Sequence, residues 1–125
     1  MNATAFRDAV ATALTDLDPD WSVHPAPVDA VAPPAYLLAW ADPWLLPSTY
    51  CVDDAFLNVV CVAARMEPEA NYPTVEEMIR RARVALAGAG FAYVQTSPPG
   101  PFDIAQVTYL AARLRVRASV DHTEE

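Results

Sequence analysis

Residues 110–120 read Leu-Ala-Ala-Arg-Leu-Arg-Val-Arg-Ala-Ser-Val, and this stretch decides the fold. From Leu110 to Val120 every even-numbered position is apolar, while the odd-numbered positions from Arg113 to Ser119 are polar. Successive side chains of a β-strand point to opposite faces, so this alternation predicts a strand with one apolar and one wet face. Such strands are typical of antiparallel sheets that are covered on one side. We therefore predict a long strand over residues 104–120, with helices packed on its apolar face.

A second stretch predicts the centre of the same sheet. Residues 54–65 contain the run Ala-Phe-Leu-Asn-Val-Val-Cys-Val-Ala-Ala, which is rich in β-branched side chains and has no glycine or proline. A strand that is apolar on both sides is usually buried on both faces. We expect this segment to be a central strand.

Two stretches have the apolar spacing of amphipathic helices, residues 4–17 and residues 74–87. Thr4 is expected to cap the first helix, and Thr74 with Glu77 forms a capping box for the second, which two glycines then end. Shorter strand candidates are residues 21–24, 35–40 and 91–96. This order predicts one α+β domain over the whole chain, with a mainly antiparallel or mixed β-sheet and two helices packed on one face.

All three tryptophans and seven of the twelve prolines lie between residues 19 and 47. This segment is too irregular for one helix and too aromatic for a solvated linker, so a long Pro/Trp-rich contact loop is expected over about residues 25–50. Tryptophan is enriched in interface hot spots. The residues expected to make the contact are Pro43, Trp44, Leu45 and Leu46. Trp21 and Trp40 have the alternative role of plugging the core beneath the loop.

The 125 residues carry a net charge of −8, and this charge is unevenly distributed. Residues 1–54 hold eight acids and one arginine, whereas residues 55–125 hold eight acids and seven arginines. An acidic chain is a poor match for a dedicated nucleic-acid-binding domain. Three interpretations of Arg113, Arg115 and Arg117 stay open: solvation of an open sheet face, pairing with acids of a neighbouring subunit, or a phosphate groove. The other arginine cluster, Arg80, Arg81 and Arg83, is interpreted as a solvated helix face.

Catalytic, metal and cofactor sites are not expected. Asp18 and Asp20 lack the glycine and bidentate glutamate of a calcium loop. Neighbours in a strand point to opposite faces, so Asp53 and Asp54 would not converge as an acid/base pair. The two histidines, His24 and His122, stand near no nucleophile motif, and the thiols of Cys51 and Cys61 are expected to be reduced and mostly buried, with a disulfide as the alternative. We expect a cytosolic chain, because no apolar run approaches a membrane span and acids stand where a secretory signal would be basic and apolar.

The layout resembles the tail terminator (tail-completion) proteins of long-tailed, siphovirus-type phages. The features that carry the resemblance are the N-terminal amphipathic helix, the Pro33-Pro34 doublet before a short strand, the Asp42-Pro43-Trp44 turn, the uninterrupted central strand and the mid-chain helix before two closing strands. The resemblance covers most of the chain. It implies a homohexameric ring that caps the tail tube protein and docks a head-tail connector or neck protein. It also implies genomic DNA passing through the lumen without sequence-specific binding, and a place in the tail or neck of the virion after assembly in the host cytoplasm.

Six copies of this chain would carry a charge of −48, and a negative channel wall repels DNA rather than holding it. The candidates for facing the lumen are Asp18, Asp20, Asp53 and Asp54. Three alternatives remain open. A neck or head-closure protein would form a similar ring on the other side of the joint, a monomeric adaptor domain would bind one partner protein, and a small enzyme would have a concave pocket with convergent polar groups.

Overall fold

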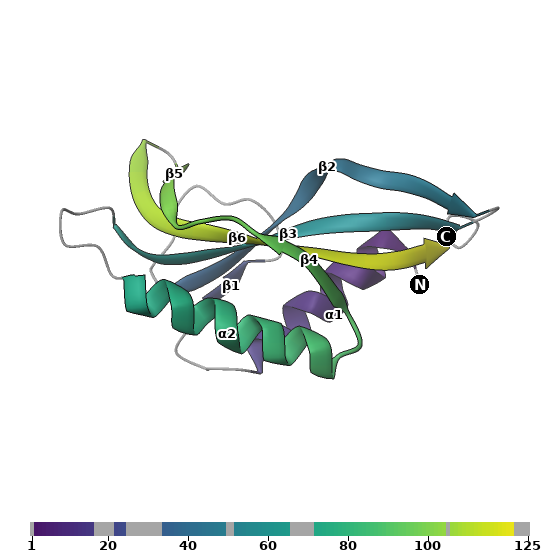
Figure 1. The fold of residues 1–125 in the computed structure, drawn as a ribbon, viewed down its shortest axis with the longest axis horizontal. Helices are drawn as coiled ribbons and strands as arrows, with labels where there is room; N and C mark the ends of the chain where they lie inside the picture. The colour runs from purple at the N-terminus through teal and green to yellow at the C-terminus, as the bar shows by residue number, and fades with distance from the viewer. Residues whose placement is uncertain are drawn as a thin grey trace.

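The computed structural model describes residues 2–16, 22–24, 34–49, 52–65, 72–104 and 106–121. The elements in chain order are α1 (Ala3–Thr15), β1 (Ser22–His24), β2 (Ala35–Thr49), β3 (Val52–Arg65), α2 (Tyr72–Gly88), β4 (Ala92–Thr96), β5 (Gly100–Ile104) and β6 (Val107–Asp121). Within these ranges the six strands form one sheet, and both helices lie on the same side of it (Figure 1).

The strand order is β1-β2-β3-β6-β4, and β5 also pairs with β6. Because β6 is long, it pairs with β4 along residues 114–117 and with β5 along residues 107–111. Of the described strand pairs, only β1 and β2 run parallel, and the others run antiparallel. The predicted α+β class is confirmed, as are the mixed, mainly antiparallel sheet and the two helices on one face.

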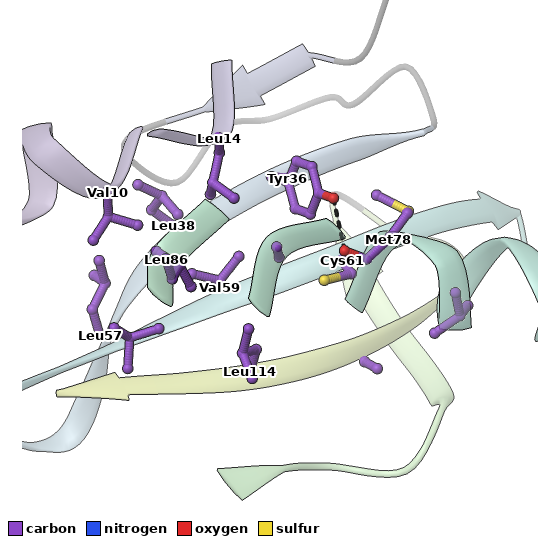
Figure 2. Packing of buried hydrophobic residues seen from close by; sticks show 14 of the residues in the cluster. Val10, Leu14, Tyr36, Leu38, Leu57, Val59, Cys61, Met78, Leu86 and Leu114 are labelled. Carbon is purple, nitrogen blue, oxygen red and sulfur yellow. Dashed lines mark hydrogen bonds between the residues drawn. The ribbon is translucent and has the colours of Figure 1, made fainter. Parts of the chain in front are cut away.

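The main core fills the space between the helices and the sheet. The residues that meet there in Figure 2 are Val10 and Leu14 of α1, Met78 and Leu86 of α2, and Tyr36, Leu38, Leu57, Val59, Cys61 and Leu114 of the sheet. The Tyr36 hydroxyl donates a 2.8 Å hydrogen bond to the Met78 carbonyl, which joins β2 to α2. The apolar side of the alternating segment, from Leu110 to Val120, faces this core as predicted. The central position of β3, between β2 and β6, is likewise confirmed.

The start of α1 differs from the prediction. The Asn2 side chain, not that of Thr4, caps the helix: its Oδ1 accepts a 2.8 Å hydrogen bond from the Ala5 backbone N–H. Both residue types are good N-caps, so the local pattern could not choose between them. Thr4 lies in the first turn, where its side chain is exposed.

The capping box predicted for α2 is also wrong. The helix begins at Tyr72, so Thr74 lies inside its first turn, and the Glu77 carboxylate accepts hydrogen bonds from two arginines further along the helix. The predicted end is confirmed. The helix ends at Gly88, and Gly90 follows with φ of +88°, a left-handed conformation that glycine adopts at little cost.

The second half of the predicted contact loop is a strand. Residues 35–49 form β2, which includes Pro43 and Pro47, while residues 25–33 lie outside the described part of the chain. β1 pairs only with residues 35–37, so the rest of β2 has β3 as its one described neighbour. Proline has no backbone N–H to donate. It is tolerated on an edge strand, where the side without a neighbour requires no hydrogen bond. The pairing with β3 is interrupted between Trp40 and Leu45, and this irregularity accommodates the Asp-Pro-Trp sequence.

The predicted strand over residues 104–120 is β6, but it begins at Val107, and Ile104 is instead the last residue of β5. β5 and β6 form a hairpin whose turn includes Gln106 at φ of +71°, an uncommon conformation for a residue other than glycine. The hairpin places Phe102, Ile104 and Val107 against a second, smaller apolar cluster on the face opposite the helices. That cluster also contains Ala35, Leu37, Val60, Val62, Tyr109 and Ala111. One end of this face is therefore covered by the chain itself. Neither helix is long and apolar enough to cross a membrane.

Candidate assembly surface

The face of the sheet that points away from the helices carries the arginines of β6. Arg113 and Arg117 are exposed, and Arg115 is half-buried between them. The guanidinium carbon of Arg115 lies 4.5 Å from the ring centroid of Phe56 on β3, a cation–π contact that holds the side chain against the sheet. Of the three side chains, that of Arg115 is therefore the one held by a contact with an aromatic ring of the sheet.

A pocket of about 440 Å³ opens beside Arg113 and Arg115. Its polar lining residues are Asp42, Asn58, Gln95, Ser97, Arg113 and Arg115, and Trp40 and Ala41 complete the wall. They come from β2, β3 and β6, together with β4 and the residue that follows it. Two hydrogen bonds join Ser97 to Arg113 in this wall. The Ser97 N–H donates to the Arg113 carbonyl at 2.8 Å, and the Arg113 N–H donates to the Ser97 Oγ at 2.9 Å. Arg117 lies outside this pocket.

The pocket is electrostatically unbalanced. Within the described part of the chain, no carboxylate forms an ion pair with Arg113, Arg115 or Arg117. The Nε of Arg115 is buried and has no hydrogen-bond acceptor among the described residues. A buried donor without an acceptor costs about 1–3 kcal/mol, so Arg115 keeps a hydrogen-bonding capacity that the described residues do not satisfy. Asp42 is the one carboxylate in the lining, and it is exposed.

Two arginines of α2, unlike those of β6, form ion pairs with a described carboxylate. Glu77 accepts from Arg80 at 2.6 Å and from Arg81 at 2.8 Å on the outer surface of the helix. Hydrogen bonds from Arg80 and then Arg81 lower the pKa of the Glu77 carboxyl from its usual 4.5 to about 2. Arg80 and Arg83 are exposed, and Arg81 is partly exposed, which agrees with the interpretation of these residues as a solvated helix face.

The expected contact residues on β2 have different environments. Trp44 is 44% exposed, and its ring lies 5.1 Å from that of Trp40, while Leu46 is 43% exposed. Leu45 instead packs against the helix-side core. Pro43 has its backbone in β2, and its side chain lies outside what the structure describes. The exposed part of the predicted contact is therefore Trp44 and Leu46.

The predicted lumen acids are described only in part, because Asp18 and Asp20 lie outside the described residues. Asp53 and Asp54 are both partly exposed at the start of β3. Asp54 pairs in register with Leu46 and Ser119. Asp53 pairs with Pro47 and Val120. Since neighbours in a strand point to opposite faces, Asp54 shares the arginine face and Asp53 points to the helix side. The two carboxylates therefore diverge, as predicted.

The described residues that could support chemistry are few. Cys61 is a free, buried thiol whose pKa is raised to about 12 by burial, which leaves it almost entirely protonated at neutral pH. His24 has a buried Nε2 without a described partner. No group of three histidine, cysteine or acidic side chains within the described residues is close enough to hold a metal ion. Cys51 and His122 lie outside the described residues.

Sequence reasoning missed that Asn58, Gln95 and Ser97 belong with the arginines. One signal was available, because Asn58 is the one polar residue in the apolar run 55–64. Its partner could be found only from the strand register, which places Asn58 opposite Arg115. The guanidinium, amide and hydroxyl groups gathered here suit the binding of a carboxylate or a phosphate. Comparisons with protein-family models and with curated protein sequences find no match to this chain.

Proposed function

We propose that this chain is a structural virion protein, a tail terminator that forms a ring on the end of a phage tail tube, stops its elongation and joins the tail to the head-side connector. The observation that carries the proposal is the unbalanced arginine pocket on a sheet face that also presents exposed Leu46. A surface with unpaired cations, on a chain that is acidic overall, favours contact with another copy of the same chain.

Three further features support this function. The α+β layout agrees with the fold that the resemblance implies. The half-exposed Trp44, anchored on Trp40, has the aromatic character of an interface hot spot. The net charge of −8 per copy suits a conduit that DNA passes without being held. Asp53 and Asp54 point to opposite faces of the sheet, so the proposed wall takes Asp53, with Asp18 and Asp20, and leaves Asp54 on the arginine face.

A capping assay tests the proposal. Tail tube subunits polymerised with and without this protein are compared by electron microscopy, and we expect shorter tubes, each with a ring at one end. A chain with Trp44→Ala and Leu46→Ala should fold normally and lose the cap. The matched control is Val84→Ala, which removes an exposed apolar side chain from α2, on the opposite side of the domain.

The outcomes separate the candidate functions. Binding to the head-side connector without any effect on tube length would assign the protein to the neck. A stable monomer that binds neither component would support an adaptor domain and contradict the terminator proposal.

A further inference from the structure

We infer that the arginine pocket is a binding site for a carboxylate of a second copy of this chain, and that Asp54 is the residue that supplies it. This inference rests on the proposed ring-forming function and deepens it, because it names both sides of the contact between subunits.

The arginine side of the contact is built before any partner arrives. Arg115 is held by the Phe56 ring, and its Nε is buried without a described acceptor. Arg113 is fixed through its backbone to Ser97 and exposes its side chain at the mouth of the pocket. Charge-assisted hydrogen bonds from guanidinium to carboxylate are about twice as strong as neutral ones. With Asp42 included, the lining keeps a net charge of one positive unit.

The carboxylate side of the contact lies on the same face of the sheet. Asp54 is partly exposed and forms no ion pair with any described residue. Within one chain it is too far from the pocket to enter it. Asp54 is in register with Ser119, whereas Arg115 is in register with Asn58, four positions further along β3. Four residues of strand span about 13 Å. A second copy is therefore needed to bring this carboxylate to these arginines.

The separation of the two sites also bears on the symmetry. If each copy offers Asp54 to the pocket of the next copy, every subunit uses one carboxylate and one pocket, and this head-to-tail contact forms a ring when the rotation between copies closes and an open filament when it does not. A reciprocal contact between two copies would close at the dimer instead. The exposed Leu46, in register with Asp54, would be buried by the same contact.

Two charge-reversed chains test the pairing, Asp54→Arg and Arg115→Asp. Each alone places like charges in every contact, so association should weaken about a hundred-fold or more. When the two variants are mixed in equal amounts, they can alternate around the assembly. In one contact, the arginine of Asp54→Arg meets the aspartate of Arg115→Asp; in the next contact, the native Asp54 of the second chain meets the native Arg115 of the first. We therefore expect each variant to be monomeric and the mixture to recover the mass of the wild-type assembly.

The control for Asp54→Arg is Asp53→Arg, the same change one residue away on the opposite face, which should assemble like wild type. Because Arg115 is half-buried and contacts Phe56, Arg113→Asp is tested in parallel, since that side chain is exposed and its loss leaves the core intact. Circular dichroism confirms that each chain is folded.

The results distinguish the inference from the function on which it rests. If wild type and both reversed chains all form the same ring, the pocket is not the contact and the inference is wrong, while the ring stands. If wild type stays monomeric with and without tail tube, the proposed function fails. If the mixture recovers only dimers, the pairing stands and the ring does not. The inference is also overturned if Arg113→Asp and Arg115→Asp assemble normally but lose binding to a short DNA duplex, because the pocket would then be a phosphate site.

Discussion

Replacing Leu57 with alanine tests the two-layer core most sharply. Leu57 lies on the central strand β3, is fully buried, and is in register with Trp40 on one side and Val116 on the other. Because strands flank it on both sides and helices cover it, the space left by the missing methyl groups cannot close easily. Leucine-to-alanine changes in such sites cost about 3 kcal/mol or more, a large share of the roughly 10 kcal/mol expected for a domain of this size.

The expected effect is easily measured. For a chain of this length, each 1 kcal/mol lowers the melting temperature by about 4 °C, so Leu57→Ala should melt about 12 °C below wild type. The same substitution at Leu46, which is 43% exposed, should change stability by less than about 0.5 kcal/mol. Urea and thermal unfolding followed by circular dichroism compare the two variants. A loss below about 1 kcal/mol for Leu57→Ala, or equal losses at both sites, would refute the packing of Leu57 between the helices and the sheet.

Three further outcomes are expected. The depressed pKa of Glu77 means that its pairs stabilise the fold fully above pH 4.5 and lose that effect as the pH falls toward 2. The melting temperature of wild type should therefore exceed that of Glu77→Gln at pH 5–7 but not near pH 2, and a difference independent of pH would contradict the pairing. In a Cys51→Ser chain, Cys61 should react with a thiol reagent at pH 8 only after unfolding in guanidinium, so fast labelling of the native protein would show that the thiol is accessible. Tyr36→Phe removes the hydroxyl that donates to the Met78 carbonyl and should cost about 1 kcal/mol in urea unfolding, whereas stability equal to wild type would mean that the bond contributes nothing.

The segments with strong local periodicity could be predicted from the sequence. Two patterns are typical of strands: the alternation that begins at Leu110 and the unbroken apolar run of β3. Both segments are strands at the expected place in the sheet. The course of β2 was not predictable in the same way. Proline interrupts a strand that is paired on both sides. Among the described residues, however, β2 has no second neighbour beyond residue 37, and this depends on where β1 pairs.

The candidate site, like the fold, could be predicted from the sequence only in part. The arginines on the wet face could be identified by alternation alone, because the period of two fixes which side chains share a face. The pocket depends on the register that places Asn58 opposite Arg115, and on the position of Ser97 after β4. Neither relation is local in the chain. The hairpin turn at Gln106 was missed because it uses a positive φ at a residue that does not signal a turn.

The mass of the protein in solution tests the central claim most directly. Light scattering is measured on the purified chain alone and after addition of the tail tube subunit. Six copies of 13.6 kDa make about 82 kDa, and we expect this mass for the free protein or for the cap that forms on the tube. A species of 13.6 kDa that stays monomeric under both conditions would contradict the ring.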